Sequence, residues 1–242
     1  MTDQPNILPI SDALAMVDRL FSADRILEDR GQDRVEIYYK QSLIGYEKLY
    51  NARGAMHLAL NDTPEFCTEG LFGQVKGLRA LLRGRPVEAI LELGSGTGFN
   101  LIWMAEKFPQ ARVIGVDLMP AHVARTKARA QEFGLANMQA RQGDFGNLPE
   151  DLGQFDLIYS IEAACYAQDL PGMFAGVAAR LKPGGLFVVY DCFRNFQPED
   201  LPPDYARAME IADAAMAVNH GFHSAARWSA AVWSGLVYGA LL

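Results

Sequence analysis

This sequence of 242 residues has few cysteines, no cluster of positive charge and no long apolar run. Its three cysteines are odd in number and lack Cys-x-x-Cys spacing, which indicates a reducing compartment. A net charge of −7 argues against broad binding to nucleic acid or to an anionic membrane surface. Residues 228–242 are apolar but too short and too interrupted by serine to span a bilayer, and the polar first residues lack the order of a signal peptide. We therefore expect a cytoplasmic protein.

Motifs for covalent and metal catalysis are also missing. Ser, His and Asp do not form a nucleophile-elbow pattern. His220 and His223 are close in sequence, but no third ligand is near, and such pairs are more often incidental than metal-binding. We predict chemistry without a metal and without a covalent enzyme intermediate.

The composition fits one large α/β domain with a small appendage, because half of the residues are apolar and 21% are charged. Residues 1–85 contain no convincing strand. The pattern predicts an amphipathic helix capped at Ser11-Asp12, a second helix over about 35–60 and a third over 68–82. We expect residues 1–85 to form a helical cap that binds substrate.

From Val87 onward, apolar strands alternate with helices. Strands with little polar alternation are typical of a parallel sheet that is buried on both faces. The prediction is a Rossmann-like, doubly wound, mostly parallel sheet with helices on both faces. We expect strands near 88–93, 112–117, 137–142, 155–161 and 185–191, and helices near 98–108, 120–134 and 171–181.

This domain is expected to cover residues 86–242 and to include a helical lid over about 194–225. In that lid a proline-rich loop precedes a helix with Tyr205, Met209, Ala212 and Met216 on one stripe, which suits an adaptable lid or burial against the sheet. The chain stops in apolar sequence at Leu242, which leaves open whether the natural protein is longer.

The most informative segment is residues 89–100, Ala-Ile-Leu-Glu-Leu-Gly-Ser-Gly-Thr-Gly-Phe-Asn. It predicts a strand, a turn with glycine at 94, 96 and 98, and a helix. Without side chains at Gly94, Gly96 and Gly98, a ligand can approach the main chain closely. The helix N-terminus favours an anionic group. Asp117 ends the next predicted strand, about 20 residues on, where an acid can accept hydrogen bonds from ribose hydroxyls.

The order of motifs over residues 87–191 resembles that of class I S-adenosylmethionine (SAM)-dependent methyltransferases. The resemblance rests on five segments, which are residues 92–98, 116–118, 142–145, 155–162 and 181–189. Residues 161–166, Ile-Glu-Ala-Ala-Cys-Tyr, are similar to a segment of sterol C-methyltransferases and related enzymes of isoprenoid or fatty-acyl carbon, and the pair Tyr38-Tyr39 is similar to one in their N-terminal helices.

The resemblance implies SAM as the cofactor and assigns roles to the motif residues. The glycine loop and Glu92 would hold the amino acid end of SAM, and Asp117 would hold the ribose diol. Leu118 and Phe145 would enclose the adenine, while Asp144 would accept from its amine and Ser160 would join the cofactor site. Alternatives stay open for two of them, since Phe145 could be plain core and Asp144 could cap a turn.

Methylation of a neutral alkene carbon generates a carbocation, which aromatic faces stabilise and a carboxylate can deprotonate. Glu162 is the candidate base, with Tyr39 and Tyr166 as candidates to line the pocket. Glu162 could equally contact SAM or cap a helix, and tyrosines on an amphipathic helix are often core.

We therefore expect methyl transfer to a small, apolar acceptor, with no nucleic acid partner and a homodimer left open. Three alternatives remain. A nicotinamide-dependent dehydrogenase fits less well, because the spacing is Gly-x-Gly-x-Gly and no Tyr-x-x-x-Lys pair is present. The others are an O- or N-methyltransferase of a small polar metabolite and a non-catalytic SAM-binding protein.

Overall fold

The structure is a computed structural model that describes residues 8–28, 34–51, 53–196, 198–218 and 222–235. Its contacts group the chain into two compact units. The first unit comprises residues 1–40 and 193–225, and the second comprises residues 41–192 and 226–242. Among the described residues, no helix is long and apolar enough to cross a membrane.

The second unit is built on a five-stranded parallel sheet in the order β3-β2-β1-β4-β5. The strands are β1 (Ala89–Leu93), β2 (Arg112–Asp117), β3 (Met138–Gln142), β4 (Phe155–Ile161) and β5 (Leu181–Tyr190). Every residue of β1 is buried, as expected for a central strand covered on both faces. Bounds for β1 to β4 agree with the predicted ones to within one residue.

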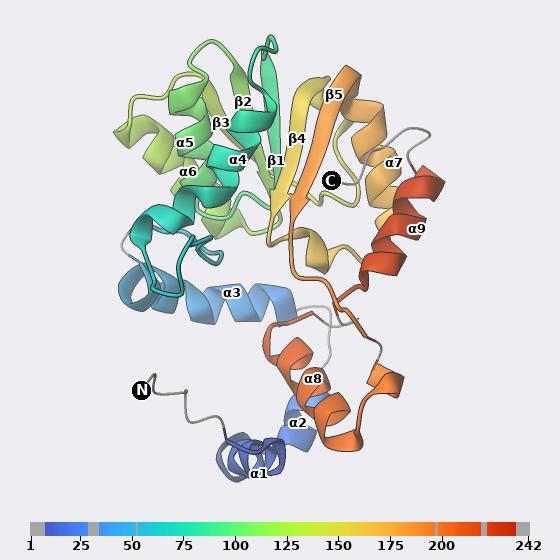
Figure 1. Cartoon of the computed structure of the whole chain (residues 1–242). Coiled ribbons are helices and arrows are strands. Elements are labelled where there is room, and N and C mark those ends of the chain that lie inside the picture. The colour runs from blue at the N-terminus through green and yellow to red at the C-terminus, as the bar shows by residue number, and fades with distance from the viewer. Residues whose placement is uncertain (1–7, 29–33, 52, 197, 219–221, 236–242) are drawn as a thin grey trace. The chain divides into compact units, whose positions relative to one another are not determined.

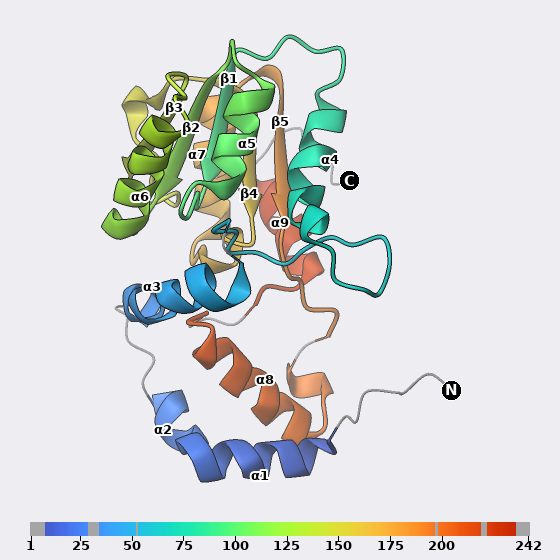
Figure 2. The ribbon, with the colours of Figure 1, turned by 90° about the vertical axis from the view of Figure 1, so that its left-hand side faces the viewer.

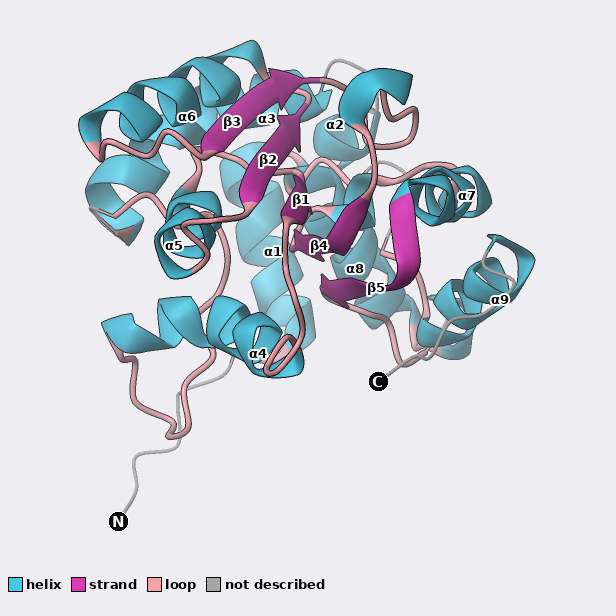
Figure 3. Cartoon of the chain, turned by 90° about the horizontal axis from the view of Figure 1, so that it is seen from above, coloured by secondary structure: helices cyan, strands magenta, loops and turns pink. Residues whose placement is uncertain are grey.

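Helices cover both faces of this sheet, as Figures 1 and 3 show: α4 (Gly73–Leu81), α5 (Phe99–Lys107) and α6 (Pro120–Glu132) lie on one face, and α7 (Leu170–Arg180) and α9 (Ala225–Gly235) on the other. The apolar layer under α4 and α5 includes Leu78, Leu101 and Met104, all fully buried. On the opposite face the ring of Phe174 packs edge-on against that of Trp228, at 5.5 Å between centroids. The predicted α/β doubly wound architecture is confirmed.

β5 begins earlier than predicted, at Leu181 instead of near residue 185. Leu181 pairs with Phe155, and pairing then resumes at Leu186 beside Leu157. The residues between them bulge out of register, and Gly184 takes a positive φ of 77° there. Residues 182–185, which lie at and before the start of the predicted strand, therefore form an irregularity inside β5.

The helix predicted over residues 35–60 is shorter in the structure. α3 (Arg34–Gly45) continues into one wide π-helical turn (Tyr46–Tyr50) and then ends. The Asn51 side chain closes a loop there by donating to the Ala55 carbonyl at 2.8 Å and accepting the Ala55 N–H at 3.0 Å. Further on, the predicted third helix forms as a 3₁₀ turn (Thr68–Phe72) followed by α4.

The contacts do not divide the chain at residue 85. Residues 54–60 extend along the glycine loop of the sheet, where the Thr97 hydroxyl donates to the Gly54 carbonyl at 2.8 Å. These contacts group residues 41–85 with the sheet. That residues 1–85 act together as a substrate-binding cap stays a prediction.

In the first unit, α1 (Ile10–Phe21), α2 (Ala23–Glu28) and α8 (Pro203–Ala215) pack around Leu14, Ala23 and Ile211 (Figure 2). α1 begins at Ile10 after Pro9 and has no side-chain cap, so the predicted cap at Ser11-Asp12 is wrong. The stripe predicted on α8 is largely exposed, so its burial is not confirmed, and a lid role stays a prediction. Tyr205, Ala212 and Met216 are exposed, because Ile211 and Ala214 supply the buried face.

Candidate functional site

The glycine loop lies where the sheet changes winding direction, at the carboxyl ends of β1 and β4. In open α/β sheets this position is the usual ligand crevice. Gly94 and Gly98 have φ values of 72° and 85°, in the left-handed region that glycine adopts readily. A β-carbon on Gly94 would lie 2.3 Å from the Cβ of Ala163, and one on Gly98 would lie 2.8 Å from Thr126 Cγ2. Both positions therefore need glycine for backbone shape and for space.

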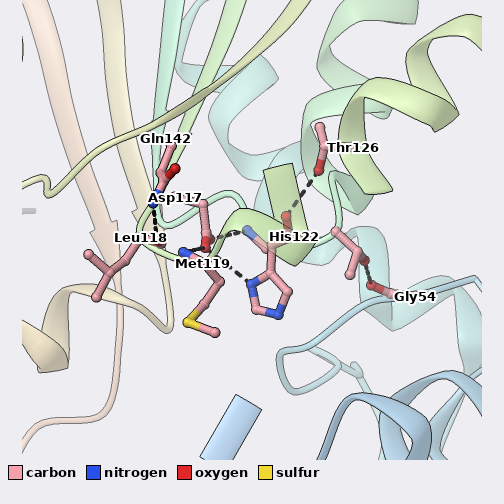
Figure 4. A network of polar contacts seen from close by, with 9 residues as sticks. Gly54, Asp117, Leu118, Met119, His122, Thr126 and Gln142 are labelled. Carbon is pink, nitrogen blue, oxygen red and sulfur yellow. Dashed lines mark hydrogen bonds and ion pairs between the residues drawn. The ribbon is translucent and has the colours of Figure 1, made fainter. Parts of the chain in front are cut away.

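Asp117 is buried at the end of β2 and holds the loop (Figure 4). Its Oδ2 accepts the N–H of Gly96 at 2.7 Å, and its Oδ1 accepts the N–H of Met119 at 2.9 Å. Oδ1 also contacts Nδ1 of the buried His122 at 3.1 Å. Since one carboxylate can accept about four hydrogen bonds, these contacts leave capacity for a ribose hydroxyl. His122 was not predicted from the sequence, because its place in the first turn of α6 gives no sign that it contacts Asp117.

We expect Asp117→Ala to weaken binding of S-adenosylhomocysteine by more than the ~1–3 kcal/mol of lost diol contacts alone, since the loop also loses an anchor. The same variant leaves the Met119 N–H and His122 without this acceptor and so lowers the free energy of unfolding. Calorimetry and thermal melts measure the two effects. Gln142→Ala is the matched control, because Gln142 donates nearby to the Leu118 carbonyl without contacting the carboxylate. Unchanged affinity in Asp117→Ala would contradict the assignment.

Glu92 is buried within β1 and is 1% exposed. Its Oε1 accepts from Asn100 Nδ2 at 3.3 Å, whereas Oε2 has no hydrogen-bond partner. Burial raises the pKa of Glu92 to about 8, and the negative charge of Asp117 adds to the rise. Tyr159 lies beside Glu92 on the adjacent strand β4, and its hydroxyl lowers the pKa of Glu92 in part. No hydrogen bond of normal geometry joins the two side chains. A cationic group beside this carboxyl group would favour its ionised form.

The residues predicted around the adenine lie on the neighbouring loops. Leu118 is 52% exposed just after β2 and is free to cover a flat ring. Phe145 packs partly against apolar clusters on the same face as α7, so it also contributes to the core. Asp144 is exposed and its Oδ1 accepts the Gly146 N–H at 2.7 Å, the turn-capping arrangement that was the alternative interpretation. Contacts of these residues with adenine stay predictions.

Glu162 follows β4 with a φ of 49°, which is strained for a residue with a side chain. Its backbone N–H donates to the Tyr190 carbonyl at 2.7 Å, and its Oε1 accepts the Leu58 N–H at 2.9 Å. Burial raises the pKa of Glu162, and the hydrogen bond from Leu58 offsets part of the rise. Nearby, Ser160 is fully buried and its hydroxyl donates to the Leu93 carbonyl at 3.2 Å, so this side chain is engaged within the sheet.

Tyr166 ends a short 3₁₀ turn (Ala164–Tyr166) that Asp191 ties to the end of β5. The Asp191 carboxylate accepts the N–H groups of Cys165 and Cys192, each at 2.8 Å. Burial raises the pKa of Asp191 to about 6 against the effect of these two bonds, and the charge of Glu162 adds to the rise. Asp191 was missed by sequence reasoning, because its role depends on contacts far along the chain.

Tyr39 and the pair His220 and His223 also came from the sequence analysis. Tyr39 belongs to the first unit, where its ring packs edge-on against Tyr38 at 5.0 Å between centroids, and its catalytic role stays a prediction. His220 lies outside the described residues. Among the residues that the structure describes, no group of three or more His, Cys, Asp or Glu could hold a metal ion.

Comparison with known proteins shows what the sheet domain is similar to. Residues 90–185 match a sequence-family model described as a methyltransferase domain. Over 114 residues the chain is 40% identical to trans-aconitate 2-methyltransferase of Deinococcus radiodurans. This match covers 47% of this chain and 42% of that protein. Over 126 residues it is 31% identical to a sterol 24-C-methyltransferase of Saccharomyces cerevisiae, covering 51% and 33%. The matched segments thus span less than half of either relative.

Among solved structures, geranyl diphosphate C-methyltransferase from Streptomyces coelicolor superposes with a TM-score of 0.59 at 19% identity, over 82% of this chain and 78% of that one. At this identity the likeness supports the fold. Residues 90–185 thus match a methyltransferase domain in sequence, and the glycine loop on a parallel sheet gives them the Rossmann-like fold of class I SAM-dependent methyltransferases.

Proposed function

We propose that this protein binds SAM at the carboxyl ends of β1, β2 and β4 and transfers its methyl group to carbon of a small apolar molecule of isoprenoid, sterol or similar lipid type. The donor half of the proposal is supported by the glycine loop, the buried Glu92 and the Asp117 anchor. The amino acid end of SAM would lie at the loop and Glu92, and the ribose at Asp117.

The observation that supports the proposed methyl acceptor is the environment of Glu162. Its strained backbone and half-buried carboxyl group are features that recur at functional sites, and the raised pKa makes it a stronger base than an exposed glutamate. Methylation of an alkene carbon leaves a cation that loses a proton to a base. Glu162 directly precedes Ala163, which packs against Gly94 of the glycine loop. Several relatives are named as sterol C-methyltransferases, and a fold neighbour is named as a C-methyltransferase of geranyl diphosphate.

A second candidate is O-methylation of a small polar metabolite. It is favoured by the 40% identity to the Deinococcus radiodurans relative and by a 32% identical relative named as erythromycin 3″-O-methyltransferase. We also propose a cytoplasmic location for the protein. That it forms a homodimer stays a prediction.

We expect methyl-labelled SAM to transfer its label to an apolar, organic-extractable acceptor when isoprenoid, sterol and fatty-acyl compounds are offered beside polar metabolites. Hot hydriodic acid then tests the type of bond, because it removes methyl groups from oxygen but leaves those on carbon. Label that survives the treatment supports C-methylation. Label released from a polar product would support the second candidate, and S-adenosylhomocysteine binding without transfer to any acceptor would indicate a non-catalytic SAM-binding protein.

A further inference from the structure

A buried chain of polar side chains connects Glu92 to the segment that extends along the glycine loop. From Glu92 it runs to Asn100 in the first turn of α5 and then to His57, whose Nε2 lies 3.2 Å from Asn100 Oδ1. His57 is 5% exposed, and its Nδ1 lies 3.0 Å from the Leu58 carbonyl oxygen. The N–H of Leu58 in turn donates to Glu162. The chain therefore joins the proposed cofactor acid to a segment that also contacts the proposed base.

Hydrogen-bond chemistry restricts the protons of this chain. A carbonyl oxygen only accepts, so Nδ1 of His57 carries hydrogen and Nε2 is the position that can gain or lose one. Asn100 has one donor end and one acceptor end, so it cannot donate to both neighbours. If its oxygen faces Nε2, then Nε2 must be protonated and the Asn100 amino group meets an ionised Glu92. If the Asn100 side-chain amide is flipped by 180°, its amino group donates to Nε2 of a neutral His57 and its oxygen accepts from a protonated Glu92.

With one proton shared between Glu92 and Nε2 of His57, these are the two arrangements that satisfy every group. The proton leaves a Glu92 oxygen and appears on His57 Nε2, or the reverse. A neutral His57 with an ionised Glu92 would set two acceptors against one amide, and the amide oxygen would face a lone pair. Buried polar groups without partners are unfavourable, so Asn100 couples the two protonation states.

The surroundings favour the uncharged arrangement in the free protein. Glu92 faces Asp117 and Tyr159, and its pKa is raised by burial. His57 faces the ring of Phe99 at 5.7 Å between centroids, and burial lowers its pKa against the effect of its hydrogen bonds to Leu58 and Asn100. On the other side, the Glu162 carboxylate accepts a hydrogen bond from the N–H of Leu58, the residue after His57. A cationic ligand group at Glu92 would reverse the preference, because it stabilises the carboxylate.

We propose that His57 is a positioning residue for the cofactor, which acts through Asn100 by taking up the proton that Glu92 gives up when the ammonium group of SAM binds. The inference rests on the proposed function, since it needs SAM at Glu92. It gives residues 54–60 a part in cofactor binding, because the charge on His57 strengthens its hydrogen bond to the Leu58 carbonyl.

Proton counting by calorimetry tests the proposal. S-adenosylhomocysteine, which keeps the ammonium group, is titrated into wild type and His57→Gln in buffers of different ionisation enthalpy. The pH is kept below the value of about 8 at which Glu92 ionises. Wild type is expected to release almost no proton, because His57 retains it. His57→Gln cannot hold the charge and is expected to release about one proton per bound ligand.

The matched control is Gln74→Met. The Gln74 side chain donates to the same Leu58 carbonyl at 2.8 Å but forms no hydrogen bond with Asn100 or Glu92. It is expected to release as few protons as wild type, even if its affinity falls. A purely structural role for His57 would change affinity in both variants without changing the proton count of either.

Nitrogen NMR of the imidazole rings gives a second readout that needs no variant to fold. The sequence has only four histidines. On addition of S-adenosylhomocysteine, one ring is expected to change from a neutral tautomer protonated at Nδ1 to an imidazolium, whereas 5′-methylthioadenosine, which lacks the amino acid end, causes no such change. If S-adenosylhomocysteine binds with no imidazolium signal and with equal proton release in wild type and His57→Gln, this inference is wrong. If it does not bind at all, the proposed function fails as well.

Discussion

Replacing Glu162 by glutamine is expected to lower turnover by a factor on the order of 10²–10⁴ while leaving SAM binding intact. An amide oxygen can still accept the Leu58 N–H, so the connection to residues 54–60 is kept. What is lost is the ability to take a proton from the acceptor after methylation. Turnover is measured with labelled SAM, and affinity by calorimetry with S-adenosylhomocysteine.

The pH profile adds a separate check. The base acts in its ionised form, so wild-type turnover is expected to fall as the pH drops through the pKa of Glu162, which burial raises above its usual range. This acidic limb should vanish from the residual activity of Glu162→Gln. Glu88→Gln is the matched control, because Glu88 precedes β1 at the other end of the sheet and forms an exposed ion pair with Lys182. Full activity in Glu162→Gln would show that the carboxyl group only holds Leu58.

Gly94→Ala is expected to abolish measurable SAM binding and to destabilise the fold. The new β-carbon would lie 2.3 Å from the Cβ of Ala163, so the ends of β1 and β4 must separate. Overpacking of this kind costs roughly 1–3 kcal/mol. The positive φ of 72° adds about 1–2 kcal/mol for any residue with a β-carbon. Chemical denaturation and ligand calorimetry measure the two losses.

Two further variants separate these causes. Gly134→Ala has a similar φ of 65° but no atom within 4 Å of the added carbon, so it should show only the backbone cost and keep SAM binding. The double variant Gly94→Ala with Ala163→Gly removes the close contact and should recover the steric part of the stability loss. If the double variant is as unstable as the sum of its single variants, the contact with Ala163 is not the cause.

Much of the sheet domain could be predicted from local sequence. Apolar runs in β1, β2 and β4 and the helical periodicity between them are strong signals, and their bounds agreed within one or two residues. Signals from weakly apolar or glycine-rich sequence were less reliable. The helix expected over residues 35–60 ends at residue 50, because the Asn51 side chain satisfies the backbone of Ala55 in a loop. β5 starts before residue 185, because the glycine-containing residues 182–185 form a bulge within the strand instead of ending it.

The candidate site divides in the same way. Glu92, Gly94 and Asp117 lie at or just after the carboxyl ends of predicted strands, and parallel strands bring such ends to one edge. His57, Asn100 and Asp191 carry no local signal, because each acts through a partner that is distant in sequence. His57 is 43 residues from Asn100, and Asp191 is 26 residues from Cys165.

By itself the sequence determined the α/β class, the glycine loop and the acidic residues proposed to bind SAM, because strand burial and turn chemistry are local properties of the chain. Only the tertiary structure decided that Asp117 anchors the loop, that Asp144 caps a turn, and that an amide connects His57 to Glu92. Those outcomes depend on which donors meet which acceptors after folding, and on how far burial shifts their protonation. Periodicity and spacing contain neither.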